Sequence, residues 1–384
     1  MIGSFFKGPP GMLNLTSAQD LNCFSASYLD AQHRFAAAQQ GVAPKLVRSL
    51  YRHAHPLLGP QQEALGCDVL HLGQSDTPQQ LLVLISGTHG VEGFAGSAIQ
   101  CDCLPLLEKI LQRHPTLGIV MIHAFNPWGF AWLRRYDHQG IDLNRNFVDF
   151  DSALPDNPDY ERLHARILQS AATDTALTAD KLPLLWQDSD QDSFTEVVTR
   201  GQYRHPDGLF YGGSAPSWSR MILEQVTAAP VFAAAHRIAV IDLHTGLGPY
   251  GYGEVINDHP LHSAGFQLAQ HWFGDNAQST VLGESVSSLK QGLLDYHWHR
   301  VIGERGCFVT LEFGTYASNR LLMAMINEQV QHNRVMQSGE TRDIHHEHIP
   351  QLKQFFYPAE TSWQQQVLFR GRQIASLALE GIMQ

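Results

Sequence analysis

Short apolar runs alternate with longer amphipathic segments along most of the chain. Runs rich in branched residues, with the length of buried strands, lie at residues 69–72, 81–85, 118–124, 237–242 and 307–312. Segments with helical spacing lie at residues 17–40, 97–112, 263–273, 293–301, 319–335 and 363–383. Ser17 is a candidate cap of the first helix, and residues 41–44 end it. Strands that alternate with helices predict an α/β fold with a mostly parallel mixed sheet flanked by helices.

Residues 149–231 depart from this alternation. They begin with a polar helical segment at 158–173 and contain a loop-rich segment at 201–213. No clear linker divides the chain, so we predict a single catalytic domain over residues 1–384. Within it, residues 149–231 are interpreted as an insertion or subdomain over the active-site edge of the sheet.

Composition excludes several classes of protein. Hydrophobic residues make up 43% of the 384 positions, which is too many for a disordered chain. The net charge of −11 argues against nucleic acid or an anionic membrane as the main partner. There is no apolar run of about 18 residues and no secretion signal pattern at the start. The odd number of cysteines, with Cys101 and Cys103 expected as buried thiols, favours a reducing, cytoplasmic location.

The strongest local motif is SGTHGVEG at residues 86–93, directly after the apolar run 81–85. It lies at the carboxyl end of a predicted strand, where open α/β sheets bind ligands. Its glycines permit a tight turn, so that His89 and Glu92 can converge on one zinc ion. A plain tight turn or a phosphate-binding loop is the alternative. The glycine spacing is not GxGxxG, however, and no P-loop lysine follows.

Two further polar residues lie at the ends of apolar runs. His244 follows the run 237–242 and is either a third metal ligand or a core histidine. Asp242, two positions earlier, is a candidate for orienting that histidine. Glu312 ends the run 307–312 and is either a buried structural acceptor or a general base with a raised pKa.

The segment IDLNRNF at residues 141–147 provides a candidate anion-binding group. A guanidinium binds a carboxylate through two parallel hydrogen bonds, and Arg145 has a second arginine, Arg135, ten positions before it. The alternative is a surface ion pair of Arg145 with Asp142 or Asp149. The motif SxxK at 287–290 also occurs, but the partner motifs SDN and KTG of the penicillin-binding serine enzymes do not.

In this order the motifs resemble those of the zinc carboxypeptidase superfamily, which has a carboxypeptidase A-like fold. The resemblance covers roughly residues 68–335 and includes the cytosolic carboxypeptidases and the succinylglutamate desuccinylase and aspartoacylase branch. The most specific local match is DLNR at residues 142–145, which looks like the DLNR segment of cytosolic carboxypeptidases. The additional segment 201–213 indicates a separate bacterial subgroup.

The resemblance implies a role for each motif residue. His89, Glu92 and His244 would hold one zinc ion, although a set of nitrogen and oxygen ligands also accepts other first-row metals. Glu312 would act as general base and then as general acid. Arg135 would polarise the scissile carbonyl and stabilise the tetrahedral oxyanion.

The resemblance also implies a set of substrate-binding residues. Asn144 and Arg145 would hold the terminal carboxylate of the substrate. The superfamily uses a mobile tyrosine near the substrate, for which Tyr296 ranks before Tyr250 and Tyr252. We therefore expect a zinc metallohydrolase that cleaves an amide bond next to a free carboxylate in a peptide. The alternatives are a zinc-dependent deacylase of small N-acyl amino acids and an inactive relative that binds carboxylates.

Overall fold

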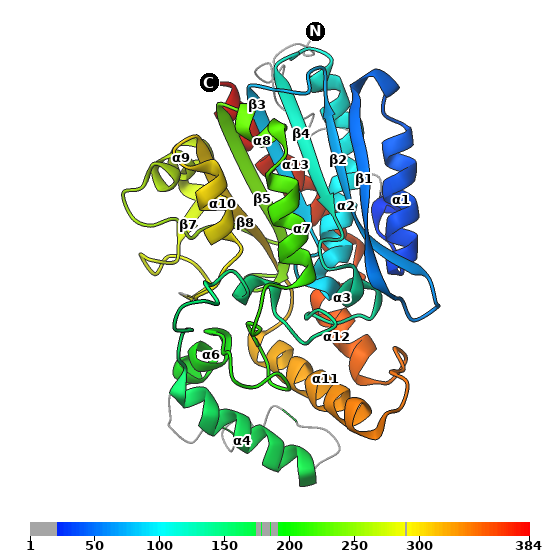
Figure 1. Cartoon of the computed structure of the whole chain (residues 1–384), viewed down its shortest axis with the longest axis vertical. Helices are drawn as coiled ribbons and strands as arrows, with labels where there is room; N and C mark the ends of the chain where they lie inside the picture. Colours follow the sequence, from blue (N-terminus) through cyan, green and yellow to red (C-terminus); the bar gives the residue numbers. More distant parts are fainter. Residues whose placement is uncertain (1–20, 174–177, 179–184, 186–190, 289) are drawn as a thin grey trace.

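The computed structural model describes residues 21–173, 178, 185, 191–288 and 290–384, and a mixed sheet forms their centre (Figure 1). Its strands are β1 (Val47–Leu58), β2 (Ala64–Gly73), β3 (Gln80–Ser86), β4 (Leu117–His123), β5 (Arg237–Gly246), β6 (Gly253–Asn257), β7 (Ala277–Ser279) and β8 (Gly306–Gly314). They lie in the order β1-β2-β4-β3-β5-β8-β6-β7. The central strands β4, β3, β5 and β8 are parallel. Strands β1 and β2 pair antiparallel with their neighbours, whereas β6 is antiparallel to β8 and parallel to β7. This confirms the predicted mixed α/β sheet.

Helices cover both faces of the sheet. The longer ones are α1 (Tyr28–Gln40), α2 (Gly93–Leu111), α4 (Pro158–Thr173), α6 (Gln191–Thr199), α7 (Trp218–Thr227), α9 (Ala264–Phe273), α10 (Asp295–Ile302), α11 (Ser318–Ser338), α12 (His348–Phe356) and α13 (Thr361–Met383). Shorter ones are α3 (Pro127–Ala131), α8 (Pro230–Ala234), η1 (Leu21–Cys23), η2 (Pro44–Leu46), η3 (Gly90–Glu92), η4 (Leu143–Arg145) and η6 (Gly274–Asn276).

Alternate side chains of the central strands enter different cores. On β3, Leu82 and Leu84 pack with α1, α2, α9 and α13, whereas Leu81 and Val83 pack on the opposite face with α7, α8 and α10. Both faces of such a strand are buried, which explains why its sequence is a continuous apolar run rather than an alternating one.

The segment 149–231 lies in two places. Helices α4 and α6 and the loop 201–213 pack with α11 and α12 below the carboxyl ends of the central strands (Figure 1). Helices α7 and α8 instead cover one face of the sheet. Only the first part of the segment therefore lies next to the strand ends where ligands bind in open α/β sheets.

Some elements differ from the sequence-based expectation. The first helix begins at Tyr28, where the Ser27 side chain accepts a hydrogen bond from the Asp30 N–H; residues 24–27 are not helical, and Ser17 lies outside the described residues. Strand β1 was not predicted, because most of its side chains are exposed at the sheet edge and its sequence has no apolar run. The short strands β6 and β7 and the helix α12 were also not predicted.

Two further observations concern the class of protein. None of the described helices is both long enough and apolar enough to span a membrane. All five cysteines are free and buried, which confirms the prediction for Cys101 and Cys103.

Candidate active site

The turn after β3 places His89 and Glu92 side by side. Gly87 adopts a φ of +75°, a conformation that favours glycine, directly after the strand ends. A Cβ atom on Gly90 would lie 2.1 Å from the backbone carbon of Gly129, so only glycine fits there. The chain then enters η3 and α2, and both His89 and Glu92 are buried, at 3% and 2% exposure.

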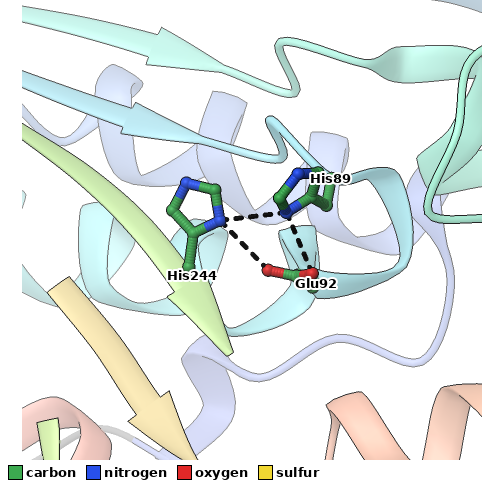
Figure 2. A group of neighbouring side chains, drawn as sticks. All are labelled: His89, Glu92 and His244. Carbon is green, nitrogen blue, oxygen red and sulfur yellow. Dashed lines mark hydrogen bonds and ion pairs between the residues drawn. The ribbon is translucent and has the colours of Figure 1, made fainter. Parts of the chain in front are cut away.

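The third member of the cluster comes from the neighbouring strand. His244 lies near the carboxyl end of β5, which pairs in parallel with β3, and its ring points toward His89 and Glu92 (Figure 2). The Nδ1 atoms of the two histidines are 3.0 Å apart. Glu92 Oε1 lies 3.0 Å from His89 Nδ1, and Glu92 Oε2 lies 3.2 Å from His244 Nδ1. Donor atoms around a tetrahedral zinc lie about 3.3 Å apart, so this spacing is close to that of a zinc ligand set.

A buried carboxylate contacts the far side of each histidine ring. Asp242 Oδ2 lies 2.6 Å from His244 Nε2, and the Thr88 hydroxyl donates to the other oxygen of Asp242. Asp142 Oδ1 lies 3.2 Å from His89 Nε2. These contacts favour a proton on each Nε2 and leave both Nδ1 lone pairs directed at the same point, as a metal site requires. The contact of Asp242 with His244 confirms the sequence-based expectation.

Arg135 contacts Glu92, His89 and Asp142 at the same time. Its Nη1 donates to Glu92 Oε1 at 2.7 Å, and its Nε donates to Asp142 Oδ2 at 3.1 Å. Its Nη2 also lies 2.8 Å from His89 Nε2 and competes there with Asp142. Only the contact with Asp142 places the proton on Nε2 and leaves His89 Nδ1 able to bind a metal. Burial would raise the pKa of Asp142, but the charges of Arg135 and His89 hold it well below its usual range.

Glu312 lies beside the metal-binding cluster, on β8. It pairs with His244 across the parallel ladder, and its Oε1 accepts a hydrogen bond of 2.9 Å from the Leu247 N–H. Burial raises the pKa of Glu312, and the negative charge of Glu92 adds to this effect, while His244 and the Leu247 N–H oppose it. A carboxylate with a raised pKa in a buried site is suited to proton transfer.

A cavity of about 110 Å³ joins these groups. The carboxyl edge of the sheet contributes His89, His244 and Glu312 to its wall, and Arg135 lies beside them. Helix α6 and the loop 201–213 add Thr195, Thr199 and Phe210; helices α11 and α12 add Leu321, Leu322, Met325 and Phe356. The cluster therefore opens onto a mostly apolar space that a small ligand could enter.

Asn144 and Arg145 line the same cavity. The side-chain oxygen of Asn144 accepts from the Leu294 N–H at 2.8 Å, which leaves its NH₂ group as a donor. Arg145 is 1% exposed, and its Nε and Nη2 donate to the Thr199 carbonyl. The alternative of a surface ion pair with Asp142 or Asp149 is wrong, because Asp142 is buried against Arg135 and His89 and Asp149 lies at the surface.

The three candidate tyrosines do not line the cavity. Tyr296 is 37% exposed, and its hydroxyl donates to the Lys290 carbonyl at 3.3 Å. Tyr250 and Tyr252 are also exposed, and the Tyr250 hydroxyl donates to Glu360. The described residues that line the cavity include no tyrosine.

Two charged residues of the cavity wall, Lys290 and Asp258, were given no role in the sequence-based prediction. Burial and the nearby Arg145 lower the pKa of Lys290 to about 8, while Asp258 and Glu312 oppose this shift. Lys290 Nζ also donates to the Ser287 hydroxyl, so the SxxK motif lies at the cavity after all. Its spacing was a visible signal, but nothing in the sequence linked it to the distant strand ends.

The Asp242 contact gives a testable prediction. Asp242→Asn should lower zinc affinity about 10- to 100-fold, because the amide is a weaker acceptor for His244 Nε2–H and no longer carries a charge. The measurement is competition for zinc with a chromophoric chelator. Asp149→Asn, which changes an exposed carboxylate, is the matched control. Equal affinities for both variants and the wild type would contradict a supporting role for Asp242.

Comparison with solved structures returned several matches at low sequence identity. Matching solved structures include carboxypeptidase A from Helicoverpa armigera, with 10% identity, a TM-score of 0.44, and coverage of 85% of this chain and 77% of that chain. An aspartoacylase family protein from Mesorhizobium loti matches with 16% identity, a TM-score of 0.37, and coverage of 77% and 68%. A succinylglutamate desuccinylase/aspartoacylase from Rhodobacter sphaeroides matches with 14% identity, a TM-score of 0.35, and coverage of 77% and 67%.

Sequence comparison places the chain in a family. No curated protein sequence matches it at a significant level. Residues 24–370 match the profile of a family described as "Protein of unknown function (DUF2817)". Because this match spans most of the chain, the protein belongs to the DUF2817 family.

Proposed function

We propose that this protein is a zinc-dependent hydrolase that cleaves an amide bond next to a free carboxylate. One observation carries the proposal: the two histidines of a two-histidine, one-glutamate donor set line the same cavity as a buried glutamate and a buried arginine. The donor set is His89, Glu92 and His244, the glutamate is Glu312, and the arginine is Arg145. Three protein ligands leave one zinc position open, as catalytic zinc sites do.

The metal site, Glu312 and Arg135 would have different roles in catalysis. A zinc ion, when bound, supplies Lewis acidity that lowers the pKa of water and polarises a carbonyl. Glu312 would accept a proton from the attacking water and pass it to the nitrogen of the departing amine. Arg135 would keep Glu92 and Asp142 in place through its hydrogen bonds, and its positive charge would stabilise the developing oxyanion.

The charges at the cavity support an anionic substrate group. Arg145 and the NH₂ group of Asn144 provide donors for a carboxylate next to the cleaved bond. Lys290 adds a further positive charge to the same wall, which Asp258 partly balances. Two cationic side chains on one wall of the cavity suit a substrate that carries a negative charge close to the cleaved bond.

The size of the cavity favours a small substrate. Its volume of about 110 Å³ is below the ~300–1,000 Å³ typical of small-molecule sites. The first part of the 149–231 segment contributes Thr195, Thr199 and Phe210 to the wall, so the cavity is closed on that side. This observation supports the second candidate, a deacylase of N-acyl amino acids, alongside a carboxypeptidase of short peptides. The complete set of ligands and base argues against an inactive carboxylate-binding relative.

The test compares substrates with free and blocked carboxyl groups. Zinc-loaded wild type should hydrolyse N-acyl amino acids or short peptides, and chelation should abolish this activity until zinc is restored. Arg145→Ala should lower kcat/KM about 10- to 150-fold for free acids, the effect of losing a charged hydrogen-bond partner. The slow hydrolysis of the corresponding amides should change little. Arg113→Ala, at an exposed arginine, is the control.

Two outcomes would contradict the proposal. If zinc-loaded protein hydrolysed no member of the panel, or if chelated protein kept its rate, the zinc hydrolase would be wrong. If Arg145→Ala weakened free acids and blocked amides equally, the hydrolase could stand, but Arg145 would not be the carboxylate-binding residue.

A further inference from the structure

A second group of metal-binding side chains lies in the first part of the 149–231 segment, outside the cavity. It consists of His164 on α4 and of His205 and Asp207 in the loop 201–213. Each offers one ligand atom, and these atoms lie within 4.8 Å of one another. His164 Nε2 is 3.3 Å from Asp207 Oδ1, and the two imidazole rings are 4.1 Å apart between centroids. We call these three residues the His164 cluster.

The turn that carries His205 and Asp207 is held in shape by its own hydrogen bonds. The side-chain oxygen of Gln202 accepts from the N–H groups of Arg204 and His205, at 2.9 and 2.8 Å. The side-chain nitrogen of Gln202 donates to the His205 carbonyl at 2.7 Å, and so does the Gly208 N–H, at 3.0 Å. The two ligand side chains therefore leave a turn whose backbone is already fixed.

Neighbouring helices fix the rest of the cluster. The carbonyl of Asp207 accepts hydrogen bonds from Gln329 and Asn333 of α11, at 3.1 and 2.8 Å. The ring of His164 stacks on Tyr160, with 17° between the ring planes. A site preorganised in this way loses little conformational entropy when an ion binds.

The surroundings of the two histidines suit metal binding. Glu161 Oε2 lies 2.9 Å from His205 Nε2, the kind of carboxylate contact that orients a metal-binding histidine. Two imidazole nitrogens and one carboxylate oxygen form a donor set that zinc and other first-row divalent metals prefer.

We propose that His164, His205 and Asp207 form a second metal site, which binds zinc and fastens the loop 201–213 to α4. A metal bound there would join two segments that are 41 positions apart in sequence, from His164 to His205. Water would complete the coordination. The site is separate from the proposed catalytic centre, and its existence does not depend on the hydrolase function.

This loop also supports the cavity wall. The Tyr203 hydroxyl donates to the Arg145 carbonyl at 2.6 Å, and the Phe210 ring lies 5.4 Å from the Arg145 guanidinium carbon. The same ring lies 5.1 Å from the guanidinium carbon of Arg135. Zinc at the His164 cluster would thereby stiffen the part of the wall that holds both arginines.

The experiment counts zinc ions per chain by mass spectrometry after chelation, zinc addition and dialysis of the full-length protein. Wild type should retain about two ions. His89→Ala and His205→Ala should each retain about one, and the double variant none. Asp207→Ala should behave like His205→Ala; its side chain is 48% exposed, so the variant should fold even if another does not. His33→Ala, at an exposed histidine, should match the wild type.

Hydrogen exchange supplies a second, independent measurement. In the His89→Ala background, zinc should slow amide exchange in residues 201–213, and adding His205→Ala should remove that effect. The proposal is overturned if His205→Ala and Asp207→Ala retain as much zinc as the wild type, which would make the cluster an ion-pair network only. If wild type retains about one ion that His205→Ala loses and His89→Ala keeps, the second site stands and the proposed catalytic zinc site fails.

Discussion

Replacing Glu312 with glutamine should lower kcat by about 10²- to 10⁴-fold while leaving the zinc content unchanged. Glutamine has nearly the same shape, and its oxygen can still accept the hydrogen bond from the Leu247 N–H. It cannot take up a proton from water or return one to the leaving amine. The measurement is steady-state kinetics on the best substrate of the panel, with zinc counted in the same preparation.

Strand β6 offers a matched control for this substitution. Glu254 pairs with Glu312 across the antiparallel ladder, is 5% exposed, and accepts hydrogen bonds from Ser285 and Val286. It does not line the cavity. Glu254→Gln makes the same chemical change at a buried neighbouring position and should leave turnover within a few-fold of wild type. Near-normal rates for Glu312→Gln would exclude Glu312 as the base.

Replacing His89 with alanine should remove the zinc ion of the proposed catalytic centre and with it nearly all turnover. Mutation of a residue that only supports a metal ligand lowers metal affinity about 10- to 100-fold. Loss of a direct ligand should therefore lower the affinity by more than that. The substitution also leaves Asp142 and Arg135 without their contacts to the imidazole. Zinc content should fall by about one ion per chain, and added zinc should not restore activity at concentrations that saturate the wild type.

A buried histidine outside the cluster tests whether this effect is specific. His123 is fully buried at the end of β4, where it contacts the Ser97 hydroxyl and stacks on Phe35. His123→Ala should reduce stability, because it opens a cavity in the core, yet retain zinc. Full zinc content in both variants would show that His89 is not a ligand, and the hydrolase mechanism would lose its basis.

The sequence alone determined the central strands and the polar residues at their carboxyl ends. Strands β3, β4, β5 and β8 are buried on both faces, so each needs a continuous apolar run, and such runs are visible without a structure. His89, Glu92, His244 and Glu312 stand at or just beyond the ends of these runs, and parallel strands bring their ends to one edge. Edge strand β1 was not visible, since an exposed strand has no such run.

Only the tertiary structure decided which loop residues contact the metal-binding cluster and line the cavity. Asp142 lies 53 positions from His89, and its contact with the imidazole depends on how the loop after α3 returns to the strand ends. Lys290 lines the cavity and Tyr296 does not, although the two residues are only six positions apart in the sequence. The His164 cluster likewise joins a helix and a distant turn. The burial of a strand is visible in its own sequence as a run of apolar residues. Contacts between loops instead depend on packing between segments that are far apart along the chain, and no local pattern predicts them.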